Sequence, residues 1–149
     1  MTALEQHPSL YLGGAFSFIF NSRREFLILR ENPGRRKYDW DLPGGTLEHE
    51  ESPLDGLTRE IYEETGLQIR LLTPACFLKW DRHESGHPIL VAFYLSEPVS
   101  DEVTLSREHV AFRWVSRSDL DSGGIHLPPS EQILDAVFNL YRQVTNCES

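Results

Sequence analysis

The feature that most constrains this chain is the stretch from Gly44 to Leu67, which reads GGTLEHEESPLDGLTREIYEETGL. It opens with a glycine-rich turn, after which Ser52 suits the N-cap of a helix and Pro53 its first helical position. Gly66 suits the left-handed residue that ends a helix. The stretch therefore predicts a loop followed by one capped helix, and the rest of the chain has to pack around this unit.

The predicted helix carries its negative charge in an unfavourable arrangement. Glu60 and Glu64 are spaced i, i+4, and Glu63 lies one turn from Glu60, so three carboxylates lie close on one side. Like charges at this spacing destabilise a helix, and the macrodipole disfavours them near the C-terminal end. A solvated acidic face is the ordinary explanation for such a cluster alone. A hard cation such as Mg²⁺ would remove the cost, because it takes oxygen ligands and commonly joins carboxylates to substrate phosphates.

The residues around these three glutamates complete a candidate site. Glu51 lies just before the helix and could fold back onto the cluster. Arg59 is expected to point away from the metal-binding face and to pair with Glu63, Glu51 or Glu48, which would hold the loop against the helix. The pair Gly44–Gly45 would let the backbone turn tightly and approach a phosphate closely.

The apolar face of the helix is predicted from its periodicity. Leu54, Leu57 and Ile61 recur at i, i+3 and i+7 and form a stripe that would face a core. Gly56 costs the helix up to ~1 kcal/mol relative to alanine. A close contact between the helix and a sheet would explain why glycine stands there.

Length and charge narrow the class of protein. With 149 residues, the chain is expected to form a single domain over residues 1–149. A net charge of −9 argues against binding a nucleic-acid polymer, although it does not exclude a small nucleotide. We see no apolar run of the ~20 residues that span a bilayer and no signal peptide. Cys76 and Cys147 have no metal-binding spacing and fit free thiols, so a cytoplasmic location with no membrane partner is expected.

The remaining segments predict a sheet with helices around it. Strands 11–20 and 25–30 are separated by a short turn and are expected to form a hairpin. The further elements expected are strands at 67–79, 89–95 and 109–116, and a final amphipathic helix over 130–144 whose inward residues are Ile133, Leu134, Val137, Phe138 and Tyr141. The pattern indicates an α/β or α+β sandwich with helices on both faces of a mixed sheet.

The spacing within the central stretch is highly specific. The pattern GX5EX7REUXEEXGU, in which U is a bulky apolar residue, is met by Gly45, Glu51, Arg59, Glu60, Ile61, Glu63, Glu64, Gly66 and Leu67. From average composition, a chance match is on the order of 10⁻⁹ per starting position. The pattern resembles the Nudix box at every fixed position. The flanking segments 40–45 and 112–115 also resemble the family's strands.

The resemblance implies a fold and a reaction. Nudix proteins share an α/β/α sandwich, hydrolyse a nucleoside diphosphate linked to another moiety, and need Mg²⁺ or Mn²⁺. Carried over, Glu60, Glu63 and Glu64 would be the metal ligands, Glu51 would assist, and Arg59 would organise the site through salt bridges. The metal would neutralise the diphosphate while an activated water attacks one phosphorus.

One position beside the box departs from the family. Glu50 stands where many members have glycine before the first box glutamate. The position lies outside the defining pattern, so it puts only the conformation of the loop in question.

The leaving group is not fixed by the box. Family members selective for ADP-ribose often carry a proline past the box, and those for dinucleoside polyphosphates a tyrosine, but residues 82–85 contain neither. By elimination, a MutT-like nucleoside triphosphate pyrophosphohydrolase is favoured. ADP-ribose, nucleotide-sugar and dinucleoside polyphosphate hydrolases stay open, as does a non-catalytic sensor that binds a nucleotide. Homodimers are common in the family, but no stretch here indicates an interface.

Candidates for contacting the substrate lie outside the box. Basic residues that could contact phosphates, or could equally be solvated surface charges, are Arg30, Arg36, Lys37 and Lys79. Arg30 and Lys79 are favoured because each ends a strand that is expected to face the box.

Aromatic and acidic residues supply further candidates. A base could stack on Tyr38, Trp40 or Trp80, although packing is the alternative for each. Some Nudix enzymes take a general base from outside the box, and Glu102 and Glu108 are candidates for this role.

Overall fold

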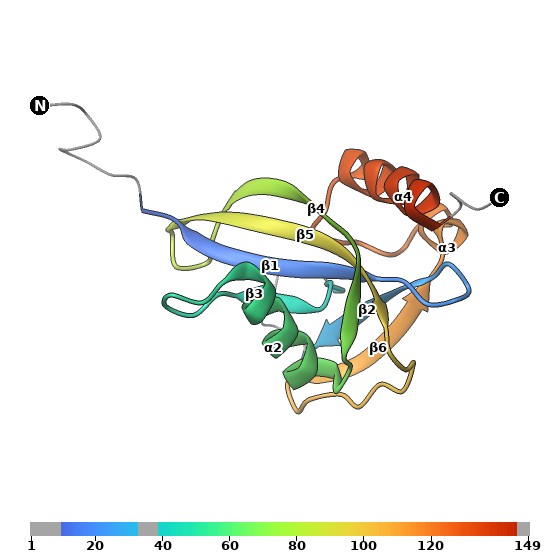
Figure 1. Ribbon diagram of the computed structural model, residues 1–149, viewed down its shortest axis with the longest axis horizontal. Helices are drawn as coiled ribbons and strands as arrows, with labels where there is room; N and C mark the ends of the chain where they lie inside the picture. The colour runs from blue at the N-terminus through green and yellow to red at the C-terminus, as the bar shows by residue number, and fades with distance from the viewer. Residues whose placement is uncertain (1–9, 33–38, 146–149) are drawn as a thin grey trace, which may run out of the picture.

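The computed structural model describes residues 10–32 and 39–145 (Figure 1). In chain order the elements are β1 (Leu12–Ile19), β2 (Phe26–Glu31), β3 (Gly44–Thr46), α2 (Pro53–Thr65), β4 (Ile69–Arg82), β5 (Pro88–Pro98), β6 (His109–Val115), α3 (Arg117–Asp121) and α4 (Glu131–Thr145). Within these ranges no helix has both the length and the apolar composition needed to cross a membrane.

The central sheet is mixed, as predicted. Its strand order is β3-β1-β5-β4. β1 pairs in parallel with β5, while the β1–β3 and β4–β5 pairs are antiparallel. This arrangement confirms the α/β class with a mixed sheet.

The predicted hairpin between the first two strands is wrong. β2 pairs with β6 in a separate two-stranded sheet, and among the described residues it meets the end of β1 through the isolated bridge Phe20–Phe26. The reason lies in the burial of β2: Phe26 and Ile28 pack into one core, and Leu27 and Leu29 into the other. A strand that is buried on both faces has a continuous apolar sequence, and such a sequence does not indicate which neighbouring strand it pairs with.

Helices α2 and α4 lie on opposite sides of the central sheet (Figure 1). Each helix closes one of two hydrophobic cores. β1 contributes to both, because Phe18 enters one core while Ala15 and Ile19 enter the other. α4 closes the first core with Leu134, Val137 and Tyr141, and Ile133 and Phe138 pack against it, which confirms the predicted inward face. α2 closes the second core.

Helix α2 begins and ends where the sequence predicts. Ser52 accepts a hydrogen bond from the backbone N–H of Asp55, Pro53 begins the helix, and Gly66 follows its last residue with φ +70°. Leu57 is fully buried, but Leu54 is 44% exposed, so the predicted apolar stripe does not extend through the first turn.

Gly56 explains this difference. A Cβ on Gly56 would lie 2.4 Å from a methyl carbon of Leu47 and 2.8 Å from Oε1 of Glu51. The close contact that the glycine allows is therefore with the preceding loop, and not with the sheet as expected. The first turn of α2 packs through Gly56 against this loop, which leaves Leu54 outside the core.

Candidate active site

Arg59 lies among the carboxylates of the box. Its guanidinium donates to both oxygens of Glu51, from Nε at 2.8 Å and from Nη2 at 2.9 Å. Nη1 lies 3.2 Å from Glu60, 3.3 Å from Glu63 and 3.6 Å from Glu48. The predicted pairing with the loop is therefore present. The expectation that Arg59 points away from the metal-binding face is wrong, because its long side chain reaches the carboxylates of the neighbouring turns.

This arrangement shifts the pKa values of the two carboxylates nearest Arg59 in opposite directions. The hydrogen bond from Arg59, with help from the N–H of Glu48, lowers the pKa of Glu51 to about 2. Burial raises the pKa of Glu60 above its usual range, although Arg59 opposes this effect. The pKa of Glu51 therefore keeps its carboxylate ionised well into the acidic range, whereas burial makes Glu60 easier to protonate than an exposed glutamate.

Glu64 is held by other parts of the chain. The backbone N–H of Gly44 donates to its Oε1 at 2.8 Å, and Nε2 of His109 lies 3.3 Å from its Oε2. The sequence did not point to His109. It stands far from the box along the chain, and no motif marks it.

Two glycines allow the loop to lie against its neighbours. Gly44 has φ +141°, and a Cβ there would lie 2.2 Å from the carbonyl oxygen of Ala15 in β1. A Cβ on Gly45 would lie 2.7 Å from Cδ of Glu60. Contacts within the protein thus account for both glycines, and close approach to a phosphate stays a prediction.

The departure at Glu50 has a structural consequence. Glu50 has φ +59°, in the left-handed region that favours glycine. The loop therefore keeps a glycine-like conformation with a glutamate in it.

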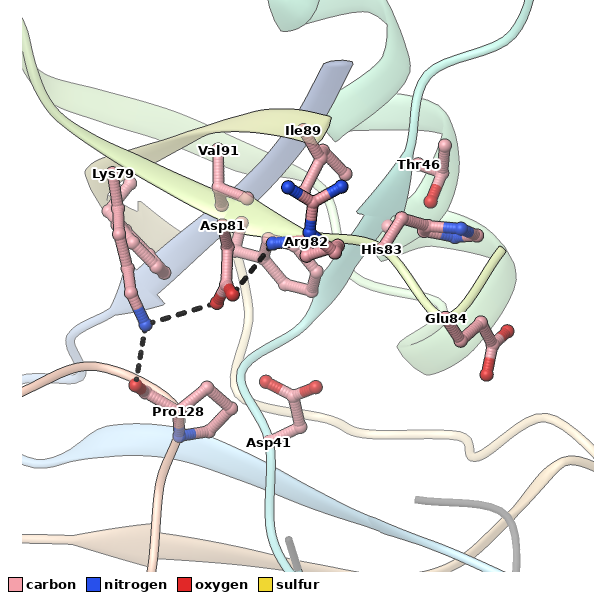
Figure 2. A pocket seen from close by; sticks show the side chains of 13 residues that line it. Asp41, Thr46, Lys79, Asp81, Arg82, His83, Glu84, Ile89, Val91 and Pro128 are labelled. Carbon is pink, nitrogen blue, oxygen red and sulfur yellow. Dashed lines mark hydrogen bonds and ion pairs between the residues drawn. The ribbon is translucent and has the colours of Figure 1, made fainter. Parts of the chain in front are cut away.

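A cavity of about 280 Å³ opens beside the box, and Figure 2 shows the residues around it. Its apolar wall comes from β1 and β5. Gly45 and Thr46 of β3 border it on the side of the box. Lys79 projects from β4 and lies 3.3 Å from Asp81, and its Nζ donates to the carbonyl of Pro128 at 3.2 Å. The lining residues are Phe16, Asp41, Gly45, Thr46, Lys79, Asp81, Arg82, His83, Glu84, Ile89, Val91, Phe93 and Pro128.

The other substrate-contact candidates lie apart from the cavity or outside the described residues. Arg30 is exposed and stacks on Trp40, with 5.4 Å from its guanidinium carbon to the ring centroid. Trp80 is on the opposite face of β4 from Lys79, where it is half exposed and contacts Arg82. The candidates that fall outside the described residues are Arg36, Lys37 and Tyr38.

The candidate general bases lie on the connection between β5 and β6. Glu102 and Glu108 are both exposed there. Ser106 on the same connection donates its backbone N–H to the carbonyl of Glu64, so this connection lies against the box helix. The role of Glu102 or Glu108 as a general base stays a prediction.

The donor set fits a hard divalent cation. Four carboxylates lie within 3.6 Å of one guanidinium, so negative charge exceeds positive charge around Arg59. Carboxylate oxygens are the ligands that Mg²⁺ prefers. Within the described part of the chain, no three acidic, histidine or cysteine side chains are placed to hold a metal ion as they stand. Arg59 binds an oxygen of Glu60 and one of Glu63, so these two side chains would have to turn toward an ion.

Comparisons with known proteins show which family the chain belongs to. The family model for the NUDIX domain matches residues 11–137. The mouse bis(5'-nucleosyl)-tetraphosphatase (asymmetrical) is 35% identical over 103 residues, which cover 64% of this chain and 66% of the mouse protein. The human diphosphoinositol polyphosphate phosphohydrolase 3-beta is 33% identical over 109 residues, which cover 71% of this chain and 66% of the human protein. The chain thus spans about two thirds of the length of these relatives.

A solved structure shows the same fold. The crystal structure of a MutT protein from Methanosarcina mazei Go1 has a TM-score of 0.61 and 28% sequence identity, covering 82% of this chain and 88% of that one. With the box, the sandwich and these similarities together, the chain belongs to the Nudix hydrolase family.

Proposed function

We propose that this protein hydrolyses a diphosphate bond in a nucleoside diphosphate derivative, with Mg²⁺ or Mn²⁺, and that nucleoside triphosphates are its favoured substrates. The observation that supports this most strongly is the position of the cavity. It borders Gly45, and Gly45 lies directly against the carboxylate of Glu60. A base in the cavity would leave its phosphates beside the box.

The surroundings of the box residues indicate a different role for each group of them. Glu60, Glu63 and Glu64, with Glu51 assisting, would hold the metal ion, which would supply charge neutralisation of the diphosphate and an activated water. Arg59 keeps Glu51 ionised and ties the loop to α2. The apolar wall of the cavity, with Phe16 and Phe93, suits the faces of a nucleobase.

The size of the cavity favours substrates with one nucleoside. Its volume of about 280 Å³ lies just below the range of about 300–1,000 Å³ that is typical of small-molecule sites. A dinucleoside polyphosphate would need a second surface for its other nucleoside. Hydrolysis of dinucleoside polyphosphates is the second candidate function, and the similarity to the mouse tetraphosphatase supports it.

A substrate panel tests the proposal. Phosphate and pyrophosphate release would be measured with Mg²⁺ for triphosphates including oxidised forms, dinucleoside polyphosphates, ADP-ribose and nucleotide sugars. We expect the triphosphates to have the highest kcat/KM. The Glu64→Gln variant should lose roughly 100-fold or more of the activity, because the charge of a metal ligand is removed.

Two outcomes would contradict the proposal in different ways. Hydrolysis of the panel with triphosphates as the poorest substrates would reject the substrate preference alone. Tight binding of a nucleotide without hydrolysis of any compound would reject the enzyme and favour a sensor module.

A further inference from the structure

Each oxygen of the Glu64 carboxylate is held by a different segment of the chain. Oε1 accepts from the backbone N–H of Gly44 at 2.8 Å, and Oε2 lies 3.3 Å from Nε2 of His109. Both side chains are nearly buried, with 12% of Glu64 and 3% of His109 exposed. Glu63, by contrast, is 58% exposed, and its carboxylate lies 3.3 Å from Nη1 of Arg59 at the surface, so it is far less constrained.

The orientation of the His109 ring follows from its two partners. An ionised carboxylate only accepts hydrogen bonds, so the hydrogen directed at Glu64 is on Nε2. On the other side of the ring, the hydroxyl of Ser106 lies 3.0 Å from Nδ1. The neutral Nε2–H tautomer satisfies both contacts, with Ser106 donating to Nδ1.

The backbone just before His109 is held against α2, the helix that carries Glu64. Thr104 and Ser106 donate their N–H groups to the carbonyls of Thr65 and Glu64, at 2.8 and 3.0 Å. The last carbonyls of a helix lack partners within the helix, so the connection before β6 acts as its cap. His109 itself begins β6 and is paired with Glu31. The imidazole is therefore held at a set position relative to Glu64.

We propose that His109, oriented by Ser106, is a positioning residue that fixes the Glu64 carboxylate in the geometry in which it binds the metal ion. This inference rests on the proposed function, and His109 acts through Glu64 without touching the substrate. Residues that orient a metal ligand in this way typically change metal affinity or activity 10–100-fold when they are replaced. The inference extends the site from the box to the connection between β5 and β6.

The test measures metal binding without substrate. Mn²⁺ would be titrated into metal-free protein, and the free ion would be followed by electron paramagnetic resonance. We expect His109→Leu to weaken Mn²⁺ binding about 10-fold or more. His109→Gln should restore most of the affinity, because its amide N–H can take the place of Nε2.

A matched control separates positioning from general loss of packing. Ser17→Ala also removes a buried side-chain hydrogen bond, but in the central sheet, and it should leave Mn²⁺ affinity unchanged. Thermal unfolding in EDTA would show which variants are folded. If His109→Leu does not fold, Ser106→Ala takes its place, and a several-fold loss of affinity is expected.

The results also distinguish this inference from the proposed function. Wild-type affinity in His109→Leu, or equal losses in His109→Leu and His109→Gln, would overturn the positioning role. Weakened Mn²⁺ binding in His109→Leu together with a wild type that hydrolyses none of the panel would support the positioning role and reject the enzyme. A wild type that binds no Mn²⁺ would overturn both.

Discussion

At the scale of single residues, Glu50 shows how a departure from a family pattern is accommodated. Its φ of +59° brings Cβ into steric conflict with its own backbone. The loop holds this conformation because its neighbour Glu51 is anchored by Arg59 and by the N–H of Glu48. The strain is therefore imposed by the surrounding contacts.

Replacing Glu50 should relieve this strain. We expect Glu50→Gly to raise the free energy of unfolding by about 1 kcal/mol, since glycine adopts positive φ without the Cβ conflict. Chemical denaturation would measure the change. Glu50→Ala is the matched control, because it removes the charge but keeps Cβ. An equal gain in both variants would assign the effect to charge.

Gly45 lies with its backbone directly against the carboxylate of Glu60. A methyl group there would lie 2.8 and 2.9 Å from the two oxygens of Glu60, so the carboxylate would have to move. We expect Gly45→Ala to reduce kcat/KM roughly 100-fold, the effect of displacing a catalytic group by about 1 Å. Adding Gly45→Ala to Glu60→Gln should cause little further loss, because both changes act on one group. Fully additive losses would show that Gly45 acts independently of Glu60.

At the scale of elements, the loop and α2 form one unit through the Glu51–Arg59 pair. Glu51 lies before the helix and Arg59 in its second turn, with two hydrogen bonds between them. Gly56 lies between these positions and leaves no room for a Cβ against Leu47 or Glu51. The capped helix and its loop therefore support each other.

The pH dependence of stability should report on this pair. The pKa of Glu51 is lowered from 4.5 to about 2, so its contribution to stability is fully present above pH 4.5. It is lost as the pH falls from 4.5 toward 2. The raised pKa of Glu60 acts in the opposite sense, since acid relieves the cost of its buried charge.

Replacing Glu51 separates its contribution to the pH dependence of stability from that of Glu60. In metal-free protein we expect Glu51→Gln to be less stable than wild type at neutral pH and to lose less stability between pH 4.5 and 2. Denaturant midpoints across this range would measure both effects. Parallel curves for the two proteins would show that the pair does not contribute to folding.

At the scale of the whole molecule, the parallel β1–β5 pair joins the two cores. Between these strands the hydroxyls of Ser17 and Ser96 lie 2.7 Å apart, and both residues are fully buried. Ser17 also contacts the carbonyl of Tyr94 at 3.1 Å. Polar groups at such depth have to satisfy each other.

This hydroxyl pair should behave as a coupled unit. We expect Ser17→Ala to lower the free energy of unfolding by about 1–2 kcal/mol, because it leaves the Ser96 hydroxyl short of a partner. The double variant Ser17→Ala/Ser96→Ala should lose less than the sum of the single losses. Strict additivity in denaturation experiments would show that the two hydroxyls do not interact.

The sequence by itself determined the parts of this protein whose causes are local. The ends of α2 follow from Ser52, Pro53 and Gly66, because a cap, a proline and a left-handed glycine each act on their own turn. The same holds for the spacing that identifies the family, and for the inward face of α4, which follows from its period.

Only the tertiary structure decided which segments meet. β2 pairs with β6, and its sequence could not show this, because a continuous apolar run specifies burial without specifying a partner. His109 reaches Glu64 because the connection before β6 caps α2, a contact between residues far apart in the chain. Local patterns thus define the box, while packing between distant segments determines what surrounds it and holds its glutamates in place.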